Sequence, residues 1–222
     1  MMADQLFDGK PVLHFSTGHD RRTFLKWAGL VGVGATFAAG VVPTTAQAAE
    51  LKANILSSSK AAKAGTDIDI LNYALTLEYL EADFYAKGLQ AGFLSGRELD
   101  LITPIGDHEN QHVAAVTQTI TTLGGTPVAK PTITYPAGVF DTKESFLKNA
   151  SVFEELGVTA YHGQVPLIQS VDILAAAASI AGVESRHAAV IATLIGGNPF
   201  PNQIEKNASM DTVLAAVTPL IS

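Results

Sequence analysis

The chain of 222 residues contains no cysteine. Disulfide bonds, thiolate zinc sites, iron–sulfur clusters and lipid attachment through cysteine are therefore excluded. Only 16% of the residues are charged, and 21 acidic residues against 14 basic ones argue against a nucleic-acid-binding surface. Any metal ion would have to be held by carboxylate and imidazole groups, a ligand set that suits iron, manganese or zinc.

The N-terminal 48 residues have the order of parts expected of a secretory signal peptide. A charged stretch, DRRTFLK at 20–26, precedes an apolar run at 27–42, and a small-residue AQA motif ends at Ala48. The run is about 16 residues long, short of the roughly 20 that a membrane span needs. We therefore predict a signal peptide over 1–48 that is cleaved after Ala48, with a retained anchor as the alternative.

The charged stretch also resembles the bacterial twin-arginine signal, except that Asp20 stands where serine or threonine is usual. This resemblance implies the twin-arginine export machinery as a partner. It also implies a location in the periplasm, outside the cell or in the cell envelope.

Residues 49–65 are small and polar and predict a flexible lead-in to a single domain over 66–222. Apolar residues then recur every three or four positions, which predicts four long helices. Their expected ranges are about 67–90, 96–124, 141–166 and 170–196, followed by a short closing helix at 209–220. Residues 124–141 hold three prolines and three glycines and predict an extended crossover. Two antiparallel hairpins joined by one long crossover make an all-α fold, the ferritin-like variant of the four-helix bundle.

Two local signals concern the second predicted helix. Ser95 and Glu98 have the spacing of a capping box, which predicts that the helix begins at residue 96. Pro104 falls on about its third turn, where a kink or a fresh start is expected.

One pattern of polar residues occurs twice in the predicted bundle. Glu78 and Glu154 are each followed seven residues later by a tyrosine, and about thirty residues later by a Glu-x-x-His motif. Residues i and i+3 lie on one face of a helix, so the Glu and His of each motif point the same way. A lone Glu from each of two helices, plus Glu-x-x-His from each of the other two, is the ligand set of dinuclear carboxylate metal centres. The predicted ligands are Glu78, Glu109, His112, Glu154, Glu184 and His187.

Charge supports this interpretation. Two divalent ions would balance four carboxylates, whereas the same groups buried without metal would strongly disfavour ionisation. Glu184 also lies in a segment with few other polar residues, SIAGVESRHAAVIATLI, where a solvated Glu and His would be out of place.

Some assignments stay open on sequence alone. Glu81 lies on nearly the same face as Glu78, and Glu155 is adjacent to Glu154, so each is an alternative ligand or a partner of the ligands. Tyr85 and Tyr161 are expected two turns along from the lone glutamates. There they would either hydrogen-bond the carboxylates or serve as ordinary core residues.

Four segments carry a family resemblance: LTLEYLEADFY, DHENQH, FEELGVTAYHG and AGVESRH. They resemble the ferritin-like domain family, and in particular its bacterial branch with twin-arginine leaders, related to plant desiccation-associated proteins. The resemblance covers about 66–196. It implies a four-helix bundle with two iron or two manganese ions at the six predicted ligands.

The resemblance leaves several functions open. One is a ferroxidase or other oxidoreductase, in which O2 or H2O2 oxidises Fe(II) to give Fe(III) and water. Another is manganese-catalase-like disproportionation of H2O2. The third is a non-enzymatic metal-binding or structural protein of the envelope in oxidative or desiccation stress. A homo-oligomer is also compatible with the Ala-rich helix faces.

Overall fold

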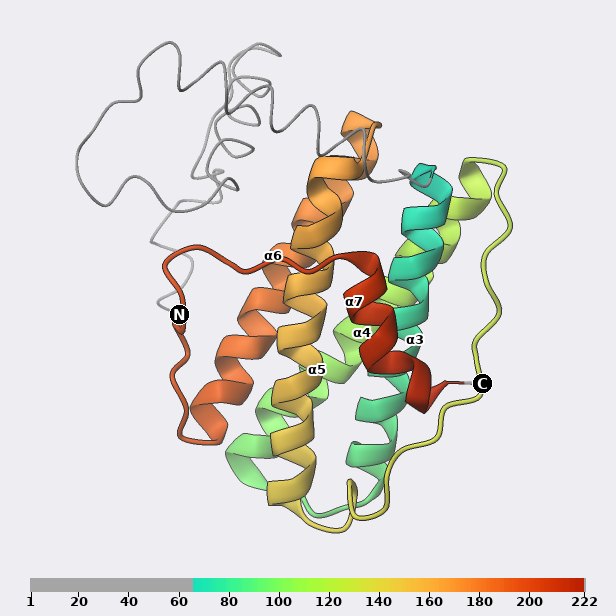
Figure 1. Ribbon diagram of the computed structural model, residues 1–222. Coiled ribbons are helices and arrows are strands. Elements are labelled where there is room, and N and C mark those ends of the chain that lie inside the picture. The colour runs from blue at the N-terminus through green and yellow to red at the C-terminus, as the bar shows by residue number, and fades with distance from the viewer. Residues whose placement is uncertain (1–65, 222) are drawn as a thin grey trace, which may run out of the picture. The chain divides into compact units, whose positions relative to one another are not determined.

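The computed structural model describes residues 66–221, and the predicted signal peptide and lead-in lie outside this range. Within it the chain forms four long helices and a short one, and an isolated bridge between Ile133 and Ile221 is the only β-type pairing (Figure 1). The predicted all-α four-helix bundle is therefore confirmed. The helices are α3 (Asp67–Gln90), α4 (Gly96–Thr122), α5 (Lys143–Gln164), α6 (Val171–Leu194) and α7 (Met210–Val217). Two 3-10 turns, η2 (Val165–Leu167) and η3 (Thr218–Leu220), follow α5 and α7.

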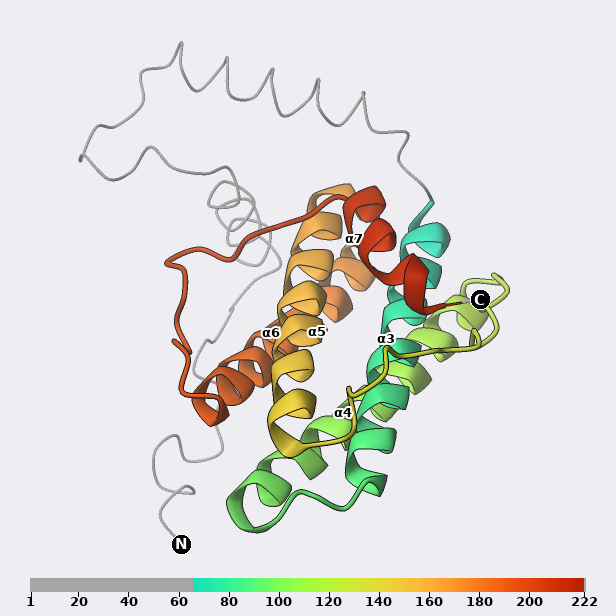
Figure 2. The same ribbon diagram turned by 60° about the horizontal axis from the view of Figure 1, so that its bottom comes forward.

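The bundle consists of two antiparallel hairpins, α3 with α4 and α5 with α6. The crossover between α4 and α5 runs the length of the bundle beside α3, and Figure 2 shows the same path from another side. The Asn72 side chain fixes its beginning, donating to the carbonyl of Thr126 at 3.2 Å and accepting from the amide of Val128 at 2.8 Å. Further along, the Tyr135 hydroxyl donates to the carbonyl of Leu80 at 3.0 Å. Because the crossover returns to the far end, α4 and α5 run in the same direction.

The helix starts follow from their capping residues, with one correction. Thr66 and Asp69 form a capping box at α3. The box predicted from Ser95 and Glu98 is wrong, although α4 does begin at residue 96: the Ser95 side chain makes no capping bond. Gly96 adopts φ 53°, so the first turn is irregular, and the Glu98 carboxylate instead accepts from Lys143 at 2.9 Å. Pro104 lies inside α4 without dividing it into two helices.

An aromatic cluster closes the end of the bundle where α3 ends and α5 begins. The Phe84 ring stacks on Phe146 with centroids 4.8 Å apart and meets the edge of Phe153 at 4.7 Å. Gly88 makes room for this packing, since a Cβ there would lie 2.0 Å from a ring carbon of Phe146. Among the helices of residues 66–221, none is both long and apolar enough to cross a membrane.

Candidate metal centre

The six predicted ligands all point into the bundle interior. The side chains of Glu78, Glu109, Glu154 and Glu184 are fully buried, and those of His112 and His187 nearly so. They come from all four long helices, one glutamate from each. Four carboxylates in a protein core carry a large desolvation penalty unless cations or hydrogen-bond donors compensate for it.

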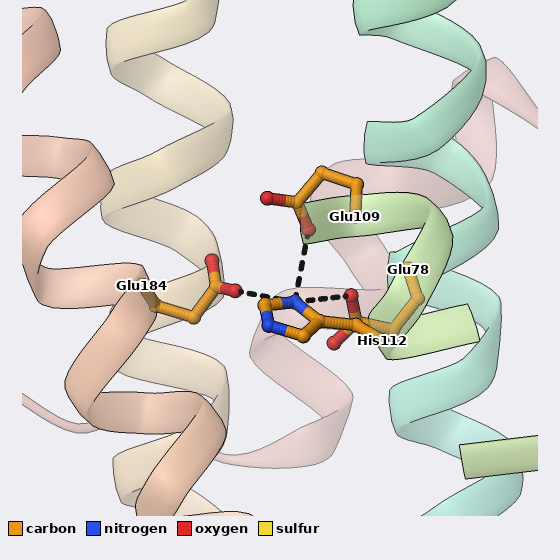
Figure 3. A group of neighbouring side chains, drawn as sticks. All are labelled: Glu78, Glu109, His112 and Glu184. Carbon is orange, nitrogen blue, oxygen red and sulfur yellow. Dashed lines mark hydrogen bonds and ion pairs between the residues drawn. The ribbon is translucent and has the colours of Figure 1, made fainter. Parts of the chain in front are cut away.

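Three carboxylates converge on one imidazole nitrogen. Nδ1 of His112 lies 3.2 Å from an oxygen of Glu109 and 3.2 Å from one of Glu184. It also lies 3.3 Å from an oxygen of Glu78, and Figure 3 shows the three carboxylates facing it from separate helices. One nitrogen carries at most one proton, so hydrogen bonding cannot satisfy three acceptors. A shared cation can, because ligand atoms held at about 2.1 Å from a metal lie roughly 3 Å from each other.

A second group lies beside the first. Nδ1 of His187 is 2.9 Å from an oxygen of Glu109 and 3.5 Å from one of Glu154. Glu109 belongs to both groups, presenting one oxygen to each histidine. In each group the potential ligand atoms lie within 4.8 Å of one another. The two groups can therefore hold metal ions that share the Glu109 carboxylate.

The hydrogen bonding of these side chains fits a metal centre. Six buried atoms of the cluster make no hydrogen bond to any described residue. Buried polar atoms are otherwise nearly always paired, and an unpaired one costs about 1–3 kcal/mol. The six atoms are Glu78 Oε2, Glu109 Oε1, Glu154 Oε2, both carboxylate oxygens of Glu184, and Nδ1 of His187. All six are lone-pair donors of the kind that iron and manganese bind.

Burial and crowding shift the pKa values of these groups. Desolvation raises the pKa of Glu78 to about 7, with a contribution from the charge of Glu109. Burial likewise raises the pKa of Glu184 well above its usual range. Burial alone would lower the pKa of His187, but its carboxylate neighbours outweigh that effect and raise it to about 10. Without metal, the cluster is therefore stable only when it holds protons, and bound cations would replace them.

The two tyrosines of the repeated pattern link the hairpins. The Tyr85 hydroxyl on α3 donates to the Glu154 carboxylate on α5, and the Tyr161 hydroxyl on α5 donates to Glu78 on α3. Burial raises the pKa of both tyrosines, so they stay protonated donors. The seven-residue spacing suggested the tyrosines but not this exchange of partners, because each bonds the glutamate of the other hairpin.

The two alternative glutamates lie in different places. Glu81 is buried, and its Oε1 lies close to Gly157, as does Oε2 of Glu184. A Cβ at residue 157 would lie 2.9 Å from each of these oxygens, so the glycine makes room for both carboxylates. Glu155 is only half-buried and lines a small surface hollow with Pro199 and Pro201, away from the cluster. Glu81 is thus a neighbour of the predicted ligands, whereas Glu155 is not.

His108 extends the cluster to the surface. Its exposed ring lies parallel to that of His187, and its Nδ1 is 2.9 Å from Nε2 of His187. This contact holds the far side of the His187 ring, so that Nδ1 faces Glu109. The six-residue ligand pattern does not include His108. Its place about 100° around the helix from Glu109 predicts either a residue beside the ligands or a surface residue, and the structure places it at the surface in contact with His187.

A family model described as a ferritin-like domain matches residues 66–197, more than half of the chain. The matched region contains every residue of the cluster. No curated protein matches the chain.

Proposed function

The chain belongs to the ferritin-like domain family, and we propose that it binds two iron or manganese ions and oxidises Fe(II) with O2 or H2O2. The observation that carries the proposal is the convergence of three carboxylates on Nδ1 of His112, at 3.2–3.3 Å. Glu78, His112 and Glu184 would hold one ion, Glu154 and His187 the other, with Glu109 shared. The charges agree, because two divalent ions balance four carboxylates.

Bound at this centre, iron or manganese supplies one-electron redox chemistry that the side chains cannot. With Fe(II) as substrate, the overall reaction would oxidise four Fe(II) for each O2, which takes up four electrons and four protons to form two waters. With H2O2 it would oxidise two Fe(II) for each peroxide, which takes up two electrons and two protons to form two waters. The six predicted ligands would bring two ions together in the buried interior of the bundle. Tyr85 and Tyr161 keep Glu154 and Glu78 in position by donating to them. Burial and the surrounding carboxylates raise the pKa of Glu81, so this neighbour of the cluster can hold a proton inside the bundle.

Oxidation kinetics test this proposal. We expect the wild-type chain to oxidise anaerobically loaded Fe(II) faster than buffer does when O2 or H2O2 is added. Glu109→Gln should lower that rate to the buffer level, because it removes the ligand that both groups share. Glu155→Gln, which changes a glutamate outside the cluster, should match wild type. Absorbance of Fe(III) in a stopped-flow instrument gives the rates, and parallel H2O2 consumption by the manganese form tests the catalase-like reaction.

Two outcomes would count against the oxidase proposal. If the chain binds metal but oxidises Fe(II) no faster than buffer does, the centre is not an oxidase, and a storage or structural role for the metal is the remaining proposal. An equal rate in wild type and Glu109→Gln would place the reaction outside the cluster.

We also propose that the twin-arginine machinery exports the protein to the periplasm or cell envelope for stress protection. The support is the order of charged, apolar and small-residue segments over residues 1–48. Cleavage after Ala48 would remove Trp27, the only tryptophan. We therefore expect exported protein to lack indole fluorescence, while unprocessed protein shows it. Indole fluorescence in the exported form would contradict the proposed cleavage.

A further inference from the structure

A cavity of about 60 Å³ lies among the four long helices, toward the end where α3 and α6 begin. Its wall includes Leu77 from α3, Val116 from α4 and Ala177 from α6. Ala115 and Ala176 also line it and are exposed, so the cavity reaches the surface between α4 and α6. It therefore offers a path from solvent into the bundle.

The wall of this cavity is almost entirely hydrocarbon. Of the described residues that line it, none is charged. The polar side-chain atoms of Tyr73 and Gln164 are fully buried and do not face the cavity. The Thr119 hydroxyl donates to a backbone carbonyl of α4, and the Tyr161 hydroxyl donates to Glu78. An apolar cavity of this kind stays dry and takes up apolar guests such as xenon.

The inner part of the cavity adjoins the first group of predicted ligands. Leu77 directly precedes Glu78 in α3, and Ile180 lies four residues before Glu184 in α6. Four residues are about one helical turn, which spans roughly 5.4 Å. Tyr161 lines the cavity and is hydrogen-bonded to Glu78. A molecule in the cavity would therefore lie one side chain or one helical turn from the carboxylate cluster.

The cluster meets solvent at a different place. Of the six predicted ligands, only His112 and His187 have exposed side-chain surface, 11% and 5%, whereas the four carboxylates are fully buried. Neither histidine lines the cavity. His108, which is exposed, contacts His187 from the surface. The bundle thus offers a polar approach on the histidine side and an apolar one through the cavity.

We propose that the cavity is the entry and holding site for O2, and that metal ions and H2O2 arrive on the histidine side. O2 is a small apolar molecule that gives up almost no hydrogen bonding when it leaves water. H2O2 carries two hydroxyl groups, and moving one hydroxyl into hydrocarbon without a partner disfavours it by roughly 30-fold or more. The cavity therefore selects O2 over H2O2. Its use as an oxidant route rests on the proposed oxidase function, whereas O2 binding there needs no metal.

The paramagnetism of O2 tests binding on the metal-free full chain, because O2 speeds the NMR relaxation of methyl groups beside it. Ala160 and Ala150 are both buried on α5, with 1% and 0% exposed, and only Ala160 lines the cavity. We expect dissolved O2 to enhance relaxation severalfold more at Ala160 than at Ala150. Ala176→Phe at the exposed mouth should remove most of this difference. Ala178→Phe, exposed on the same helix but outside the wall, is the matched control and should retain it.

Oxidation kinetics then test the route. With Fe(II)-loaded protein, Ala176→Phe should lower the ratio of the O2 rate to the H2O2 rate severalfold, because it obstructs only the apolar approach. Ala178→Phe should keep the wild-type ratio. Metal analysis of each sample in parallel shows that the variants carry the same amount of iron.

Two results would overturn the proposal. One is equal relaxation enhancement at Ala160 and Ala150, which would show that O2 does not reside in the cavity. The other is an unchanged ratio of the two rates in Ala176→Phe, which would show that O2 reaches the centre elsewhere. A loaded chain that oxidises no Fe(II) with either oxidant would instead contradict the oxidase function, and the relaxation measurement would still decide whether the cavity binds O2.

Discussion

Glu109→Gln will lose metal at both positions of the centre, whereas His187→Ala will lose it at only one. Glu109 presents one oxygen to each histidine, at 3.2 Å and 2.9 Å, and is the residue common to both potential ligand groups. The amide keeps the shape of the carboxylate but removes its charge. Loss of a residue that only hydrogen-bonds a metal ligand typically weakens metal binding 10- to 100-fold. Loss of Glu109, a ligand shared by both groups, should therefore weaken metal binding by more than about 100-fold.

Elemental analysis after dialysis against trace metal gives the ion count for each variant, and circular dichroism shows that the helices persist. His112→Ala and Glu184→Ala should each lose about one ion or more, because both belong to the first group. Glu155→Gln is the matched control and should keep the wild-type count. Wild-type metal content in Glu109→Gln would show that the shared-ligand geometry is wrong.

The metal-free protein will become less stable as pH rises from 4.5 to about 7, and metal will reverse this trend. The folded-state pKa of Glu78 is about 7 against 4.5 for an ordinary glutamate. Over that interval the folded chain holds a proton that the unfolded chain has released, so stability falls as pH rises. The pKa values of Glu81 and Glu184 are also raised, and raised values for His112 and His187 extend the loss above pH 6.5.

The pKa of Glu109 is shifted in the opposite direction, to about 2. The stability that this group contributes changes only below pH 4.5, so it does not offset the loss at higher pH. For Glu78 alone, the free energy of unfolding should fall by about 3 kcal/mol between pH 4.5 and about 7. For a domain of this size, that loss corresponds to a decrease of roughly 6–12 °C in Tm. Metal binding displaces the protons, so its stabilisation grows with pH. At a free metal concentration of 100 times Kd, metal binding at one site stabilises the folded chain by about 2.7 kcal/mol.

Thermal melts with EDTA and with saturating Mn(II), over pH 4.5 to about 7, measure both trends. The two sets of Tm values should diverge as pH rises. Glu78→Gln should flatten the EDTA series, because it removes one of the titrating groups. Parallel series, or a metal-free protein that gains stability with pH, would contradict the account of the buried cluster.

Much of this fold could be predicted from the sequence, because its signals are local. Apolar spacing gave the four long helices, and the Thr142 and Ser170 caps lie where helix starts were expected. The capping box predicted from Ser95 and Glu98 does not form, because the Glu98 carboxylate accepts a hydrogen bond from Lys143, 45 positions away in the sequence. The spacing of residues within one helix cannot predict a contact with a residue so distant in the sequence.

For the candidate site as well, the sequence predicts what depends on one helix alone and does not predict what depends on packing between helices. Helical spacing identifies residues that share a face, so it could select Glu109 with His112 and Glu184 with His187. It could not tell whether Glu81 or Glu155 enters the interior, because that depends on how each helix is rotated against its neighbours. The space that Gly157 leaves beside Glu81 and Glu184 is likewise set by packing between helices.

The central claim is a dinuclear metal centre built around Glu109. Anomalous X-ray scattering at the manganese edge, on crystals of the chain loaded with Mn(II), tests it most directly. The account predicts two peaks about 3.5–4 Å apart. One should lie among Glu78, His112 and Glu184, and the other between Glu154 and His187, with Glu109 reaching both. An absence of peaks at these residues, or a single peak at the protein surface, would contradict it.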